Sequence, residues 1–114
     1  MRFEIQGRKL TVTDALRTHI ERRLQFALGR FGGRVASVKV CLQDINGPRN
    51  GTGMRCRIAV GVRPTGSVVI EDTDADLYAA VDRAADRAGR SVGRHLERAR
   101  DRERDGRGGR EIPT

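Results

Sequence analysis

Aromatic residues are scarce in this sequence, which has no tryptophan, one tyrosine and three phenylalanines among its 114 residues. The core of a single domain of this length must therefore come mainly from valine, isoleucine, leucine and alanine. The scarcity also argues against an extensive base-stacking platform, with which many proteins hold single-stranded nucleic acids. Lysine is rare as well: Lys9 and Lys39 are the only two, so arginine supplies 21 of the 23 basic residues. Arginine favours bidentate phosphate contacts and stacks on bases, which suits RNA.

Long apolar runs and cysteine clusters are also missing. No run approaches the roughly 18 apolar residues of a membrane span, and the N-terminus lacks a signal-peptide core. We therefore expect a cytoplasmic protein without a membrane partner. Cys41 and Cys56 agree with this, because two cysteines make neither a disulfide scaffold nor a zinc site. The strand pattern described below places them on opposite faces of a sheet, so two free thiols are predicted.

Positive charge is in excess. The 23 Lys plus Arg against 15 Asp plus Glu give a formal net charge of +8 and a pI near 11.1. A domain this basic favours polyanionic partners through charge and counterion release. The clearest concentration of charge is a stripe at helical spacing between residues 76 and 104, formed by Arg83, Arg87, Arg90, Arg94 and Arg98. Apolar residues from Leu77 to Ala99 recur with the same period on the other side. The segment is therefore predicted to be a helix with a buried apolar face and an exposed arginine face.

A charged helix face is often only a solvated face, so the stripe alone does not identify a binding site. The acidic residues beside it, Asp82, Asp86 and Glu97, are too few to neutralise it, and the whole chain shares the excess of positive charge. We therefore interpret the stripe as a candidate RNA-binding surface.

The N-terminal third predicts a strand and a helix. Residues 1–6 alternate between apolar and polar side chains, which is typical of a short strand. Residues 14–29 carry an apolar stripe with Thr13 as a suitable N-cap, which predicts a helix. His19 is expected on its polar side as an addition to the RNA surface. The polar side is also expected to carry Arg22, Arg23 and Arg30.

Three alternating segments in the middle of the chain predict strands at residues 35–45, 54–63 and 67–71. The loop at residues 46–53 is rich in glycine, but neither a Gly-Lys-Ser/Thr motif nor a helix follows it. We therefore interpret it as a hairpin loop rather than a phosphate-binding loop. Secondary candidates for RNA binding lie on the outward face of the strands, at Lys39, Arg55, Arg57 and Arg63.

The predicted order is β-α-β-β-β-α, an α+β fold. Strands with one apolar face need a cover on one side only, and the two amphipathic helices supply it. We therefore expect a four-stranded sheet with two helices packed on one face over residues 1–104, followed by a disordered basic tail at residues 105–114. Both helices would present their arginines on the same side, so that eight guanidinium groups form one groove or ridge.

The remaining polar residues have structural interpretations. Asp72, Asp74 and Asp76 are predicted to cap the second helix, because the glycine and the distal glutamate of a calcium loop are missing. His95 lies on the apolar side and is assigned to packing, and Tyr78 is expected to be a buried anchor with a hydrogen-bonded hydroxyl. The sequence has no nucleophile–base pair, metal-ligand spacing or cofactor motif, so we expect neither an enzyme nor a cofactor nor a small-molecule substrate.

Three stretches of the chain carry a family resemblance: MRFEIQGRKLTVTDALRTHIERRL at the start, VASVKVCLQ at residues 35–43 and DLYAAVD at residues 76–82. They resemble the ribosome hibernation-promoting factor / ribosome-associated inhibitor A family, also called sigma-54 modulation proteins, and the third is similar to that family's D-[ML]-Y-x-A-[IV]-D motif. Their order and spacing extend the resemblance over about residues 1–104. It implies a double-stranded-RNA-binding-domain-like fold and a short-form protein, without the dimerising C-terminal domain of the long form.

The resemblance also implies a function. Members bind the small ribosomal subunit through 16S rRNA, occlude the mRNA and tRNA channel and silence idle ribosomes under stress or in stationary phase; we expect this chain to be monomeric off the ribosome. The eight arginines would contact rRNA phosphates rather than read bases. Two alternatives remain open: a general RNA-binding module and a protein-binding modulator of a sigma factor. The sequence departs from its relatives at Gly89 and Gly93, which are expected to weaken the second helix by about 1 kcal/mol each relative to alanine.

Overall fold

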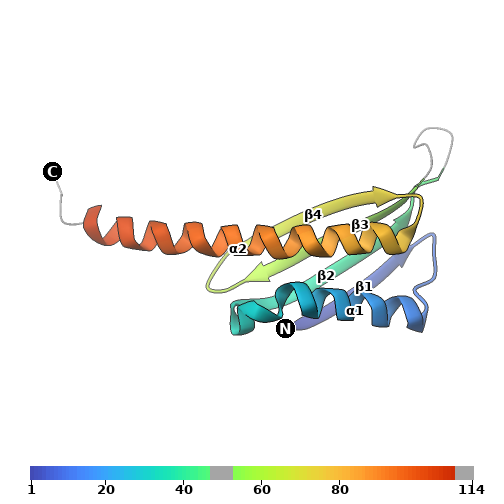
Figure 1. The fold of residues 1–114 in the computed structure, drawn as a ribbon, viewed down its shortest axis with the longest axis horizontal. Helices are drawn as coiled ribbons and strands as arrows, with labels where there is room; N and C mark the ends of the chain where they lie inside the picture. The colour runs from blue at the N-terminus through green and yellow to red at the C-terminus, as the bar shows by residue number, and fades with distance from the viewer. Residues whose placement is uncertain (47–52, 110–114) are drawn as a thin grey trace.

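The structure, a computed structural model, describes residues 1–46 and 53–109, with side chains up to residue 102. Its elements follow the predicted order, with one 3₁₀ helix inserted after the first α-helix (Figure 1). The elements are β1 (Arg2–Arg8), α1 (Asp14–Leu28), η1 (Gly29–Arg34), β2 (Val35–Asp44), β3 (Met54–Val62), β4 (Ser67–Asp74) and α2 (Leu77–Gly109). The predicted α+β fold class is therefore confirmed.

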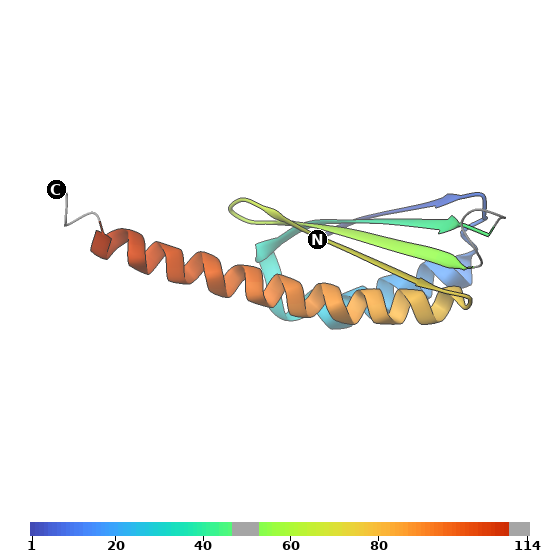
Figure 2. The same ribbon diagram turned by 90° about the horizontal axis from the view of Figure 1, so that it is seen from above.

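The four strands form one sheet in the order β1-β2-β3-β4, in which β1 and β2 are parallel and the other neighbours are antiparallel. A parallel pair needs a crossover connection, and α1 provides it. Both α-helices cover the same face of the sheet (Figure 2). The apolar rows of the strands face these helices, and Val38, Val40 and Leu42 are buried as predicted.

The two cysteines occupy opposite sides of the sheet, and both are free thiols, as predicted. Cys56 is buried beneath the helices, whereas Cys41 belongs to the outward row of β2. Burial, reinforced by the nearby charge of Asp72, raises the pKa of Cys56 to about 12. Cys56 therefore stays a neutral thiol at physiological pH.

Helix α1 begins where the sequence predicts because Thr13 caps it. The Thr13 Oγ1 accepts a hydrogen bond from the backbone N–H of Leu16 at 3.1 Å. The apolar stripe of the helix is buried, at Leu16, Ile20, Leu24 and Leu28. The helix then tightens into η1, within which Gly32 has a φ of 56°, a conformation that glycine adopts at little cost.

Helices α1 and α2 run side by side in the same direction (Figures 1 and 2). Two contacts fix their offset at 63 residues: His19 with Asp82, and Arg23 with Asp86. Because the offset is the same one turn further along, successive turns of α1 face successive turns of α2. Residues far apart in the sequence are thereby brought into one helical layer.

The buried face of α2 is made of small side chains, which allows the helix to lie close to its neighbours. They include Ala80, Ala84, Ala85 and Ala88. Gly89 continues this surface toward α1, where a β-carbon would lie only 2.9 Å from the carbonyl oxygen of Ala27. From the sequence, Gly89 was expected only to destabilise the helix. In the structure, its lack of a side chain allows the backbone of α1 to approach α2 closely.

The expectation for Tyr78 was wrong. Its side chain is exposed, and its hydroxyl makes no hydrogen bond to any residue that the structure describes. The ring packs edge-on against His19, with 4.8 Å between the ring centroids, because Tyr78 faces α1 rather than the sheet. His95, by contrast, has the predicted packing role: it is half-buried and lies against Gly66 in the turn between β3 and β4.

Some boundaries differ from the predicted ones. Strand β4 continues to Asp74, and α2 continues to Gly109 rather than ending near Arg104. Residues 110–114 of the predicted tail, and residues 47–52 of the predicted hairpin loop, lie outside the described residues. Within the described part of the chain, no helix combines the length and apolar composition that crossing a membrane requires.

Candidate nucleic-acid interface

The inward row of β4 changes from apolar to acidic along the strand. Val68 and Ile70 pack toward the core, and the next two positions of the row are Asp72 and Asp74. Arg83 of α2 binds both carboxylates, with its Nη2 atom 2.9 Å from Asp72 and 2.8 Å from Asp74. Part of the predicted arginine stripe thus lies against β4 instead of facing solvent unpaired.

Arg87 belongs to the same cluster. Its Nη1 atom lies 3.3 Å from Asp72 and donates to the carbonyl oxygen of Glu71 at 2.8 Å. Two of the five arginines in the predicted stripe are therefore already neutralised within the protein. Their side chains attach α2 to the edge of the sheet, which reduces their availability for phosphate.

The pKa of Asp72 reflects two opposing effects. Desolvation raises the pKa, but the hydrogen bonds and charges of Arg83 and Arg87 lower it and prevail. The pKa of Asp74 is also lowered, first by the backbone N–H of Asp76 and then by Arg83. The same hydrogen bonds raise the pKa of Arg83. Asp72, Asp74 and Arg83 are therefore charged at neutral pH.

Replacing Asp72 with asparagine should change the acid sensitivity of the fold. A carboxylate whose pKa is lowered by folding stabilises the protein above its unfolded pKa of about 3.9, and this contribution is lost as the pH falls through the folded value. We expect D72N to be about 1 kcal/mol less stable at pH 7 and to lose less stability on acidification. Urea unfolding at neutral and acidic pH measures both effects, and equal acid dependence in the two proteins would contradict the prediction.

Of the three aspartates predicted to cap α2, Asp76 does so, whereas Asp72 and Asp74 lie within β4 and do not. Asp74 Oδ1 accepts a hydrogen bond from the backbone N–H of Asp76 at 2.8 Å, and Asp76 Oδ1 accepts one from that of Tyr78 at 2.9 Å. The pairing with Arg83 was missed. The sequence did contain a signal for this pairing. If the inward–outward alternation of β4 is continued through Thr73, Asp72 and Asp74 fall on the face that the helices cover.

A second ion-pair group lies between the helices. Arg23 places its Nε 3.3 Å from Asp82 and its Nη2 3.1 Å from Asp86. His19 Nε2 lies 2.7 Å from the same oxygen of Asp82. Arg23 and His19, both predicted to contribute to an RNA surface, are therefore half-buried components of the α1–α2 contact.

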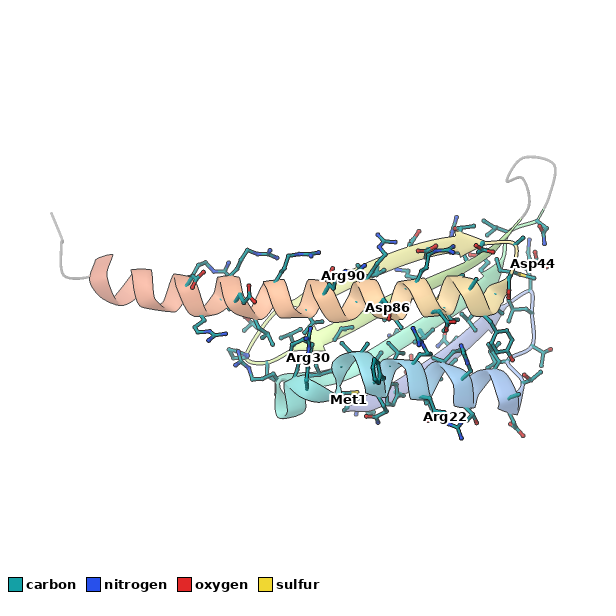
Figure 3. The ribbon with its side chains drawn as sticks, in the orientation of Figure 1. Met1, Arg22, Arg30, Asp44, Asp86 and Arg90 are labelled. Atoms are coloured by element: carbon teal, nitrogen blue, oxygen red, sulfur yellow. The ribbon has the colours of Figure 1, made fainter. Side chains whose placement is uncertain are left out.

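Five of the eight predicted arginines have no carboxylate partner among the described side chains, and all five are exposed: Arg22, Arg30, Arg90, Arg94 and Arg98. We call them the free arginines. Arg30 stacks over the Phe31 ring at 4.6 Å from its centroid, and Arg94 donates to the Ser91 hydroxyl. In Figure 3, Arg22 projects from α1 away from α2, whereas Arg30 extends toward α2. The free arginines thus extend across the helical layer instead of forming one line.

A basic hollow of about 920 Å³ lies beside the second half of α2 and was not predicted from the sequence. Its four arginines come from two elements, with Arg30 and Arg34 in η1 and Arg100 and Arg102 in α2. Phe31, Pro64 and Leu96 supply its apolar lining, and Glu97 is its one acidic residue among those described. Periodicity within one helix does not reveal this site, because η1, the β3–β4 turn and α2 meet there only after folding.

The outward face of the sheet carries both signs of charge. Lys39 lies 3.6 Å from Glu4, and Glu71 lies 3.9 Å from Arg55 and 3.8 Å from Arg57. The remaining secondary candidate, Arg63, lies past the end of β3. These partially compensated residues form a weaker anion site than the free arginines.

A comparison with known protein families identifies the chain. The model of the family described as Sigma 54 modulation protein / S30EA ribosomal protein matches residues 3–100. The chain belongs to this family. The resemblance inferred from three short stretches of the sequence is therefore confirmed over most of its length.

Individual S30EA relatives support the assignment. The ribosome hibernation promotion factor of Deinococcus radiodurans is 29% identical over 82 residues, which are 72% of this chain and 42% of that protein. The chain thus spans less than half of that relative. The N-terminal domain of Thermus thermophilus Protein Y is 37% identical, with a TM-score of 0.70 over 83% of this chain and 99% of that one. A ribosomal subunit interface protein from Coxiella burnetii, with 13% identity, a TM-score of 0.72 and coverage of 85% and 99%, shares the fold.

The structure gives a physical role to the DLYAAVD stretch of this S30EA protein. Asp76 caps the start of α2, Tyr78 packs on His19, and Asp82 binds His19 and Arg23. The small residues between them are largely buried against the core. The stretch therefore fixes the position of α2 relative to α1, and with it the positions of the free arginines.

Proposed function

We propose that this S30EA-family protein silences idle ribosomes. It binds the small subunit through 16S rRNA and occupies the mRNA and tRNA channel, without catalysis, and it is a cytoplasmic monomer when off the ribosome. The observation that carries the proposal is the distribution of charge on the helical layer. Three of its predicted arginines are neutralised internally, while five remain exposed and have no carboxylate partner within the described part of the chain.

The physical basis of binding is the release of counterions from rRNA. Each arginine that neutralises a phosphate releases condensed cations, which favours association at low salt. Arginine also matches phosphate geometry through two N–H donors. Contacts of this kind position a protein on RNA without reading its sequence, so exclusion of mRNA and tRNA follows from the volume that the bound domain occupies.

Sedimentation with purified small subunits over a series of salt concentrations tests the proposal. If all five free arginines contact phosphates, the plot of log affinity against log salt should have a slope of roughly −4. Large subunits and duplex RNA serve as competitors, and small subunits should be preferred to both. Equal competition by duplex RNA would indicate a general RNA-binding module, and salt-independent binding would contradict a phosphate-based contact.

A further inference from the structure

Phe26 is the most exposed of the large apolar side chains in the described structure, at 83%. Isolated exposed apolar residues are common and require no function. Phe26, however, lies four residues after Arg22 on α1 and lines a hollow together with Arg30 of η1, so a free arginine lies on each side of it. An exposed aromatic ring in this position is bordered by unneutralised positive charge on both sides.

A hollow of about 330 Å³ extends from Phe26 across to α2. Phe26, Ala27 and Arg30 line it from the α1 side, and Asp86, Gly89 and Arg90 line it from α2. Figure 3 shows Arg30 pointing toward the helix that carries Asp86 and Arg90. The carboxylate of Asp86 is already bound by Arg23 at 3.1 Å. The hollow therefore combines one aromatic ring with two free guanidinium groups.

We infer that Phe26 stacks on an unpaired base of the bound RNA, while Arg30 and Arg90 bind the phosphates next to that base. This inference rests on the proposed function and adds a contact to it. A nucleotide presents a flat π-surface and an anionic phosphate within one unit, which matches an exposed ring between arginines. An apolar protein partner would instead have to cover the surrounding guanidinium groups, at a high cost in desolvation.

Because the chain contains no tryptophan, a tryptophan introduced at residue 26 is a specific fluorescent probe of this site. In F26W the indole is the sole tryptophan, and stacking on a base should quench its fluorescence. We expect quenching when F26W is titrated with small subunits and with a single-stranded oligoadenylate. Affinity for small subunits should fall about tenfold in F26A and similarly in F26L, because leucine keeps apolar volume but has no π-surface. F26W should bind at least as well as the wild type.

Two controls separate stacking from charge and from folding. The salt slope should be the same in all three variants, because none of them loses a phosphate contact. Their unfolding temperatures should match that of the wild type, since Phe26 is exposed.

The inference is overturned, while the proposed function stands, if F26A and F26L bind small subunits like the wild type or if bound F26W is not quenched. Binding that F26L keeps and F26A loses would indicate an apolar protein contact and would also overturn it. If the wild type does not bind small subunits at all, the proposed function fails. The oligoadenylate titration then decides the stacking by itself: quenching supports it, and constant fluorescence refutes it.

Discussion

Replacing Arg90 and Arg94 together with glutamate should lower the affinity for small subunits by about 100-fold at moderate salt, with the fold intact. Both side chains are exposed, and neither has a carboxylate partner among the described residues. Each substitution removes a cation from the surface that we propose binds RNA and adds an anion that repels phosphate. The salt slope should fall by about two, one unit for each lost contact.

A matched control exists on the same helix. R83E/R87E makes an equal change in net charge, but the new carboxylates would face Asp72 and Asp74, which now bind Arg83 and Arg87. This variant should unfold at a lower temperature, because four acidic groups would lie together where ion pairs existed. R90E/R94E should unfold like the wild type.

Sedimentation with small subunits and thermal unfolding distinguish the two double variants. If R83E/R87E kept its unfolding temperature and lost binding, while R90E/R94E bound normally, the assignment of the free arginines would be wrong. That result would mean that the pairs with Asp72 and Asp74 open on the ribosome. Alanine at Arg83 and Arg87 then measures their contact with phosphate without the added repulsion.

The fold could be predicted because its elements follow simple periods of apolar residues. Alternation at Val38, Val40 and Leu42 identified the buried face of β2, and spacing of three or four identified the buried face of each helix. Thr13 fixed the start of α1 through a local hydrogen bond. These features depend on neighbours within one segment, so the sequence of that segment contains the necessary information.

The candidate site could be predicted only in part, because the partner of each arginine depends on how the segments pack. The last strand was predicted to end at Glu71 because its inward-facing apolar residues end at Ile70. The row in fact continues with Asp72 and Asp74, whose charge conceals their inward position from any hydrophobic pattern. Helical spacing likewise shows that Arg83 and Arg90 are outside the core, but it does not show that Arg83 faces these carboxylates and Arg90 does not.

The offset between α1 and α2 was also invisible in the sequence, and it determines the role of Gly89. By helix propensity alone, replacing either Gly89 or Gly93 with alanine should stabilise the protein by about 1 kcal/mol. A β-carbon at Gly89 would lie 2.9 Å from the Ala27 carbonyl oxygen and 3.3 Å from the Ala27 β-carbon. Because a backbone atom cannot rotate away, G89A should force the helices apart and reduce stability by about 2 kcal/mol.

Gly93 provides the matched comparison. A β-carbon there would meet the Arg30 guanidinium at 3.5 Å and the Phe31 ring at 3.6 Å, which are ordinary contact distances. G93A should therefore raise stability by about 0.5–1 kcal/mol, opposite in sign to G89A. Urea unfolding of both variants measures the difference, and equal stabilisation by the two would show that the helices are farther apart at Gly89. Because Gly89 also lines the hollow between Phe26 and Arg90, G89A should weaken RNA binding more than G93A does.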